Sequence, residues 1–265
     1  MTMKAHDAKN QPLAARPGPA VESLEVRIPC GKAWLYGDLA LPADFSGLVL
    51  FAHGSGSGRH SARNRQVAAA LQNVGIGTLL LDLLTAEEEQ EDLRTGEHRF
   101  DIALLTRRMQ DATAWVWAQA PLKNTAVGYF GASTGSAAAL IAAARLGARI
   151  SAVVSRGGRP DLAGPVVLSS LKAPTLLIVG GADHGVIELN EQAYRHMSCE
   201  KHLAIVPRAT HLFEEPGALE QVCALAASWF TRHLQQADTR PGEPALHGAN
   251  RTEATHRPTT SKEPF

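Results

Sequence analysis

Residues 126–137 read AVGYFGASTGSA, and this stretch decides the fold. An apolar run ends in Gly131-Ala-Ser133-Thr134-Gly135, and an alanine-rich helical pattern follows. A serine at a strand–turn–helix junction is held in a strained conformation with its hydroxyl above the sheet, and the flanking glycines let strand and helix approach each other. The amide of Thr134 then begins the helix, where an oxyanion can bind. The alternative is a glycine-rich turn that merely contains a serine.

The rest of the chain alternates short apolar runs with amphipathic helical patterns. The runs predict strands at 22–28, 33–40, 47–53, 77–82, 124–129, 150–155, 174–180 and 202–207. Several later runs are continuously apolar, which is typical of strands buried on both faces of a parallel sheet. The pattern predicts an α/β fold with a mostly parallel, doubly wound sheet of about eight strands and helices on both faces.

Two segments between predicted elements are candidates for covering the sheet edge at which ligands bind. Residues 156–173 have room for one short helix only, so no large cap domain is expected. Residues 85–101 are predicted to form a long loop whose acidic run lies in solvent or helps to wall the pocket.

Composition sets the domain organisation and excludes some functions. The 265 residues are 45% hydrophobic and 20% charged, and 26 basic side chains balance 26 acidic ones. This balance does not favour nucleic acid or a membrane surface as partner, and no apolar run is long enough to span a bilayer. We expect a flexible arm over 1–20, one domain over 21–236 and a disordered tail over 237–265, both ends being poor in large apolar groups. The three cysteines fit no disulfide or zinc pattern, so a reduced cytoplasmic protein is expected. The oligomeric state is not predicted.

Two further polar residues follow predicted strands. Asp183 comes directly after strand 174–180, and His211 follows the last predicted strand. The carboxyl ends of parallel strands meet at one sheet edge, where ligands bind in doubly wound folds. Ser133, Asp183 and His211 could therefore form a nucleophile, an orienting acid and a base. Asp161 and Glu188 are weaker candidates for the acid, and Asp183 could instead cap the following helix.

At these motifs the chain resembles the α/β-hydrolase superfamily, and within it the dienelactone-hydrolase-like proteins. The resemblance spans about 21–236 and is strongest in FAHGSGSGRHSARN, GASTG, VGGADHGV and ATHLFEEPG. It implies that Ser133 is the nucleophile, His211 the general base and acid, and Asp183 the residue that fixes the imidazole tautomer. It also implies that the amides of Ser55 and Thr134 form the oxyanion hole.

One position departs from the family pattern. True dienelactone hydrolases carry cysteine where this chain has Ser133, so their substrate is not carried over. The chain is more similar to relatives with a serine nucleophile, some of which are fused to phosphoribosyltransferase domains.

Substrate contacts are expected from His53 and Gly54 and from basic side chains near the same edge. The basic candidates are Arg59, His60, Arg99 and Arg156, each of which could instead be solvated or held in an ion pair. Residues 54–60 could also form a phosphate nest, although they lack the Gly-Lys-Ser/Thr ending of a P-loop.

The sequence thus predicts a serine hydrolase that cleaves a small-molecule carboxylic ester, thioester or lactone without a metal or organic cofactor. An acyltransferase, an amidase or peptidase, and a non-catalytic ligand-binding protein of the same fold are the alternatives.

Overall fold

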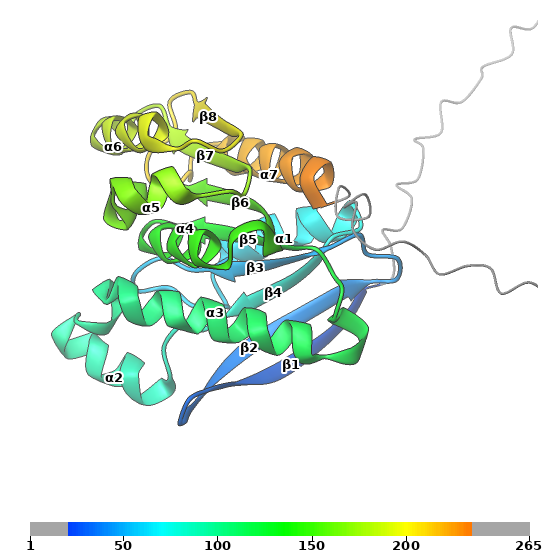
Figure 1. Cartoon of the computed structure of the whole chain (residues 1–265). Helices are drawn as coiled ribbons and strands as arrows, with labels where there is room; N and C mark the ends of the chain where they lie inside the picture. Colours follow the sequence, from blue (N-terminus) through cyan, green and yellow to red (C-terminus); the bar gives the residue numbers. More distant parts are fainter. Residues whose placement is uncertain (1–20, 235–265) are drawn as a thin grey trace, which may run out of the picture.

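The computed structural model describes residues 21–234, which form an eight-stranded sheet covered by helices on both faces (Figure 1). The strands are β1 (Val21–Cys30), β2 (Ala33–Pro42), β3 (Leu48–Ala52), β4 (Gly77–Leu81), β5 (Val127–Ala132), β6 (Ile150–Arg156), β7 (Thr175–Gly180) and β8 (Lys201–Val206). Their order across the sheet is β1-β2-β4-β3-β5-β6-β7-β8. The predicted arm and tail lie outside the described residues.

The sheet is mixed at one edge and parallel elsewhere. Strand β2 pairs antiparallel with both β1 and β4, and all pairings from β4 through β3 to β8 are parallel. All eight predicted strands are therefore confirmed, as is the mostly parallel α/β class. β5 spans Val127–Ala132 instead of the predicted 124–129, so it begins and ends later, and at its end Gly131 pairs with Ala52 of β3 and Ala132 with Arg156 of β6.

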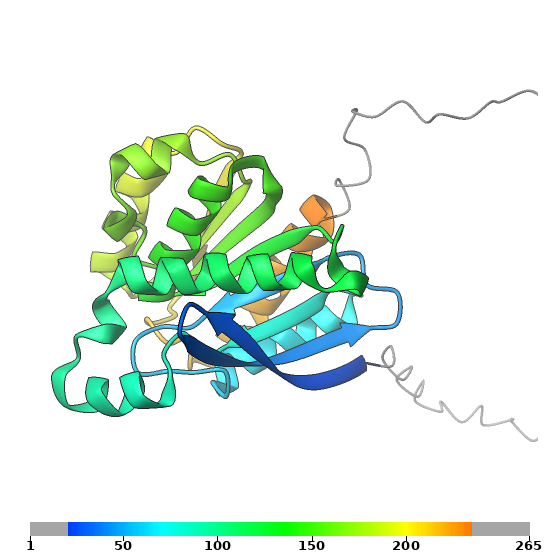
Figure 2. The ribbon, with the colours of Figure 1, turned by 60° about the horizontal axis from the view of Figure 1, so that its bottom comes forward.

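Helices cover the two faces unequally (Figures 1 and 2). They are α1 (Ala62–Asn73), α2 (Ala86–Thr95), α3 (Ile102–Ala118), α4 (Thr134–Leu146), α5 (Pro165–Ser170), α6 (His184–His196) and α7 (Ala218–Leu234). Helices α3 to α6 pack on one face, and α1 and α7 on the other. Each face has its own apolar core, because alternate side chains of a strand point to opposite sides. In β3, Leu50 belongs to the first core and Val49 and Phe51 to the second.

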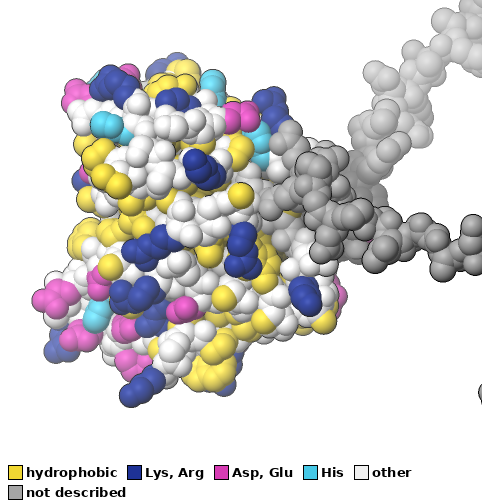
Figure 3. Space-filling model, viewed as in Figure 1, with side chains coloured by type: hydrophobic (Ala, Val, Ile, Leu, Met, Phe, Trp, Pro, Cys, Tyr) yellow, Lys and Arg dark blue, Asp and Glu magenta, His cyan; other side chains and the backbone are white. Residues whose placement is uncertain are grey.

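The segment predicted as a loop over 85–101 contains α2 and the 3-10 turn η1 (His98–Phe100), so this prediction was wrong. Thr85 caps the helix in a reciprocal arrangement with Glu88, whose carboxylate accepts a hydrogen bond from the Thr85 amide at 2.8 Å. The acidic first turn is favourable at the positive end of the helix dipole, and Gly96 ends the helix at φ 69°. Charged side chains of both signs gather over this helix at the lower left of the molecule (Figure 3).

The interval between β6 and β7 holds only short elements. A 3-10 turn η4 (Pro160–Ala163) precedes the six-residue α5, in agreement with the prediction that no large cap domain lies here. Among residues 21–234, none of the helices has the length and apolar character needed to span a bilayer.

Candidate active site

Ser133 lies at the sharp turn between β5 and α4. Its backbone has φ 50° and ψ −123°. Non-glycine residues rarely adopt this strained conformation, and it persists only where the surrounding contacts enforce it. A Cβ on Gly131 would collide with the backbone of Ser136, and one on Gly135 would collide with the carbonyl oxygens of Ala52 and His53. Both glycines are therefore needed for the strand and the helix to close around Ser133, as the sequence predicted.

The turn and the segment beside it are held by side chains that belong to none of the sequence motifs. The Ser136 hydroxyl donates to the carbonyl oxygen of Ser133 at 2.7 Å and accepts from the amide of Arg159 at 3.0 Å. Buried Asn190 of α6 donates to the carbonyl oxygen of Gly158 at 3.0 Å. The sequence position of Ser136 could have predicted this role. Ser136 comes three residues after Ser133, in the first turn of α4, where a serine side chain can bond back to the backbone of the preceding residues.

Asp183 and His211 are in direct contact. The Nδ1 atom of His211 lies 2.7 Å from the Oδ2 atom of Asp183. Asp183 occupies the N-cap position of α6, yet its side chain makes no capping hydrogen bond there. The carboxylate is therefore directed at the imidazole instead of the helix, and the Nδ1 proton is donated to it in the neutral tautomer that leaves Nε2 free to accept.

The loop that carries His211 is fixed on both sides of the histidine. Glu215 accepts hydrogen bonds from the amide and the hydroxyl of Thr210, at 3.0 and 2.6 Å. Phe213 is fully buried and holds a positive φ of 56°. The loop is thus held by the hydrogen bonds of Thr210 directly before His211 and by the burial of Phe213 two residues after it.

The segment after β6 connects His211 with Ser133. The Ser133 amide donates to the carbonyl oxygen of Arg156 at 3.2 Å. A Cβ on the next residue, Gly157, would lie 3.5 Å from Cε1 of His211. The imidazole therefore lies against the strand end that also binds the backbone of the serine.

Ser55 and Thr134 lie together beside the same turn. Their hydroxyl oxygens are 3.0 Å apart, and their backbone amides donate to no other residue of the described range. A Cβ on Gly54 would lie 3.1 Å from Cβ of Ser133, so glycine at position 54 lets the loop after β3 approach the serine. Two unpaired amides next to a serine hydroxyl are the arrangement that can bind an oxyanion.

His53 holds this loop in place. Its Nδ1 lies 3.0 Å from the carbonyl oxygen of Gly54, and its Nε2 accepts the amide of Leu83 at 2.9 Å. Burial lowers the pKa of His53, so the neutral form is favoured. Both ring nitrogens are engaged within the protein, and the side chain serves to connect the ends of β3 and β4.

Arg59 and Arg156, two of the basic residues considered as substrate contacts, lie in different surroundings. The guanidinium of Arg59 pairs with Glu25 at 2.8 Å and lies 3.5 Å from both Asp38 and Asp82. Arg156 is the last residue of β6 and is buried. Its Nε and Nη1 atoms have no hydrogen-bond partner within the described residues, and its guanidinium lies 5.9 Å from the ring centre of Phe213. Burial lowers the pKa of Arg156 to about 10.

The chain is similar in sequence and in fold to known proteins. A dienelactone hydrolase from Anabaena variabilis is 54% identical, with a TM-score of 0.79, over 80% of this chain and 98% of its own. The chain belongs to the dienelactone-hydrolase family of α/β-hydrolases. An esterase of Pyrococcus furiosus, 16% identical with a TM-score of 0.66 over 80% of this chain and 92% of its own, shares the fold of this α/β-hydrolase. No protein-family model matches the chain.

Curated relatives carry a different name. Two proteins from Mycobacterium tuberculosis strains, provisionally named phosphoribosyl transferases, are each 53% identical over 216 residues, which is 82% of this chain. This α/β-hydrolase spans 48% of their length, about half.

Within 21–234, no three His, Cys, Asp or Glu side chains are grouped so that they could hold a metal ion.

Proposed function

We propose that the protein is a carboxylic ester hydrolase that cleaves a small-molecule ester, thioester or lactone through an acyl-enzyme on Ser133. The observation that carries this proposal is the Asp183–His211 hydrogen bond of 2.7 Å, whose imidazole lies against the same end of β6 as the backbone of Ser133, the serine at φ 50°. A serine hydroxyl is nearly inert at neutral pH and needs an adjacent base, which in turn needs an orienting group. The family membership supports a hydrolase independently of this geometry.

The residues support the following cycle. The Ser133 Oγ attacks the carbonyl carbon while Nε2 of His211 accepts its proton, and the amides of Ser55 and Thr134 stabilise the oxyanion. The tetrahedral intermediate collapses, the bond to the alcohol or thiol breaks, and His211 donates its proton to that leaving group. A water molecule then attacks the acyl-enzyme as His211 accepts its proton, and collapse returns that proton to Ser133 and releases the acid. Asp183 stabilises the imidazolium in both halves.

The proposal extends to the cellular setting. Cys30, Cys199 and Cys223 are free thiols. Burial raises the pKa of Cys30 and of Cys223 to about 11, which disfavours the reactive thiolate. Free thiols are typical of a reducing compartment such as the cytoplasm, and we include that setting, with a small acyl substrate, in the proposal.

A fluorophosphonate probe tests the nucleophile. We expect stoichiometric labelling that is lost in Ser133→Ala and retained in Ser169→Ala, a serine whose hydroxyl bonds only within α5. A panel of p-nitrophenyl esters, lactones and thioesters then identifies the class of bond. Folded wild-type protein that is neither labelled nor active on any of them would instead indicate a ligand-binding protein.

A further inference from the structure

A cavity opens directly beside the proposed oxyanion hole. It has a volume of about 250 Å³ and lies between the loop after β3, helix α2 and helix α3. Residues 53–57 and Thr134 form its floor. An engineered apolar cavity of about 150 Å³ holds a benzene ring, so this space has room for roughly ten carbon-sized atoms.

The position of the cavity decides which part of an ester it can receive. Ser55 and Thr134 line it, but His211 and Asp183 do not. The carbonyl carbon of a bound ester carries three groups. The oxygen lies at the two amides, the leaving atom must lie near His211 to receive a proton, and the acyl chain takes the remaining direction. A cavity on the oxyanion side and away from the imidazole is where the acyl chain fits.

The walls combine leucines with charged side chains, and those charges do not balance. Leu84, Leu93 and Leu105 line the cavity. Of the charged lining residues, Arg99 is bound to Asp92, with its backbone amide 2.9 Å from Oδ1 and its Nη2 2.8 Å from the Asp92 carbonyl oxygen. Glu89 forms no ion pair with any described residue. The lining thus carries one uncompensated negative charge, and His53 in the floor is held neutral by its lowered pKa.

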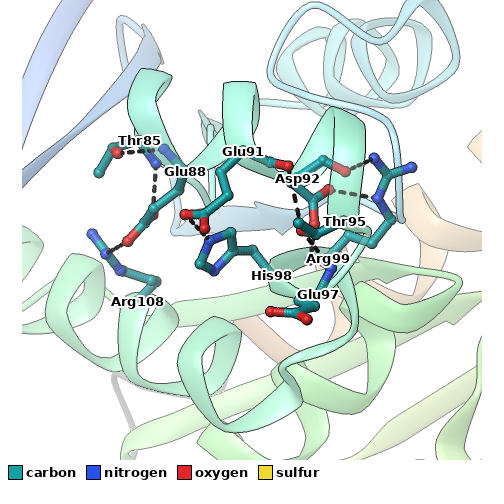
Figure 4. Close-up of polar contacts among 9 residues, drawn as sticks. All are labelled: Thr85, Glu88, Glu91, Asp92, Thr95, Glu97, His98, Arg99 and Arg108. Atoms are coloured by element: carbon teal, nitrogen blue, oxygen red, sulfur yellow. Dashed lines mark hydrogen bonds and ion pairs between the residues drawn. The ribbon is translucent and has the colours of Figure 1, made fainter.

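Helix α2 is fixed over the cavity by its own ion pairs (Figure 4). Arg99, from η1, binds Asp92 at the C-terminal end of the helix, and Arg108 of α3 donates to Glu88 at 2.7 Å in the first turn. His98 lies 3.0 Å from Glu91 between them. The outer wall of the cavity is therefore held at both ends, so its size and lining are set before any ligand enters.

We propose that this cavity is the acyl pocket of the enzyme, and that Glu89 makes it select short uncharged acyl groups over those ending in a carboxylate. This inference rests on the proposed hydrolase function. It names the substrate class as esters, thioesters or lactones whose acyl part has up to roughly ten heavy atoms, the size that the cavity admits.

Chain length tests the pocket. With p-nitrophenyl acetate, butyrate, hexanoate and dodecanoate, kcat/KM should rise about fourfold per added methylene up to hexanoate and fall for dodecanoate. Leu93→Ala should lower the ratio of hexanoate to acetate severalfold. Val166→Ala is the matched control, because Val166 is 79% exposed and Leu93 75%, but only Leu93 lines the cavity. A parallel series of acetate esters with growing alcohol chains should not respond to Leu93→Ala. A response of that series instead of the acyl series would overturn the assignment.

Charge tests Glu89. The ratio of kcat/KM for mono-p-nitrophenyl adipate to that for the hexanoate compares acyl groups of equal length with and without a carboxylate. Glu89→Gln should raise this ratio about two- to fivefold at low salt, since one nearby carboxylate is removed. Glu87→Gln, on the same helix but outside the cavity lining, should leave it unchanged. An unchanged or lower ratio in Glu89→Gln contradicts the proposal.

Fluorophosphonate labelling separates the two levels of failure. If Ser133 is labelled and acetate is hydrolysed while neither ratio responds, the pocket assignment is wrong and the hydrolase stands. If the folded protein is not labelled at all, the proposed function itself fails.

Discussion

His211 and Asp183 lie 28 residues apart in the chain, yet the Nδ1 atom of one is 2.7 Å from the Oδ2 atom of the other. The contact exists because β7 and β8 are adjacent and parallel, so that the loops at their carboxyl ends emerge side by side. Asp161, the other aspartate considered for this role, instead binds Arg159, with 2.8 Å between Oδ2 and Nη2. The structure thus pairs the imidazole with one of the candidate acids.

Replacing this carboxylate should nearly abolish catalysis without unfolding the protein. We expect Asp183→Asn to lower kcat for p-nitrophenyl esters by about 10³- to 10⁴-fold, because the amide no longer fixes the tautomer or stabilises the imidazolium. Asp161→Asn is the matched control and should change kcat less than tenfold. Circular dichroism verifies that both variants are folded. Equal losses in the two variants would show that the acid has been misassigned.

Because α4 lies close to the end of β3 at the Ser133 turn, replacing Gly135 should destabilise the fold. Gly135→Ala places a Cβ against the carbonyl oxygens of Ala52 and His53, so we expect a loss of about 2–4 kcal/mol in the free energy of unfolding. Gly185→Ala, also in a helix but with nothing within 4 Å of the added Cβ, should be neutral or stabilising by up to about 1 kcal/mol. Urea denaturation measures both, and a tolerated Gly135→Ala would contradict the packing described at the turn.

Ser136 should act as a positioning residue for the nucleophile. Ser136→Ala removes the hydroxyl that donates to Ser133 and accepts from Arg159, and we expect about 1–3 kcal/mol of destabilisation. Because the hydroxyl orients the turn and takes no part in proton transfer, kcat should fall while the pH profile keeps its shape. A displaced pH profile would indicate that Ser136 participates in the chemistry.

Buried His53 should make folding sensitive to mild acid. Burial lowers its pKa from the ordinary 6.5 in the folded state, so the unfolded chain binds more protons below neutral pH. Its contribution to stability is therefore complete above about pH 6.5 and is lost as the pH falls toward the lowered value, with a slope of up to about 1.4 kcal/mol per pH unit. We expect His53→Gln to be less stable at pH 7.5 and to show a smaller decrease between pH 7.5 and 5.0. Urea denaturation at both values measures this, and an unchanged decrease would mean that other groups, such as buried His233, account for it.

The ion pair under α2 should control the mobility of the pocket wall. Burial alone would raise the pKa of Asp92, but hydrogen bonds from the Arg99 amide and guanidinium outweigh it and hold the pKa below its ordinary value. The carboxylate therefore stabilises this segment above about pH 4 and stops doing so as it is protonated in stronger acid.

We expect Asp92→Asn to increase amide hydrogen exchange across α2, with a local loss of about 1–3 kcal/mol. Glu91→Gln, which removes the more exposed pair with His98, should cost less than about 1 kcal/mol. Similar exchange in both variants would show that Asp92 does not hold the helix.

The sequence alone determined the strands, the turn at Ser133 and the family. Each of these is recorded in local patterns: continuous apolar runs for buried parallel strands, and glycines flanking a serine where strand and helix must meet. The helix α2 was also recorded locally, in the spacing of Thr85 and Glu88, but the acidic composition of the segment obscured it.

Only the tertiary structure decided which polar groups meet. Arg59 is bound by acids from β1, β2 and the end of β4. The buried Arg156 instead has Nε and Nη1 atoms without a hydrogen-bond partner within the described residues, and its guanidinium faces the ring of Phe213, although both arginines looked alike as candidate substrate contacts. His53, also considered as a substrate contact, accepts the amide of Leu83 through Nε2 and at the same time lines the cavity beside Thr134. The physical reason is that hydrogen bonds and ion pairs act over a few ångströms, so the partner of a loop side chain depends on which strand ends the sheet order brings together. No local pattern records that order.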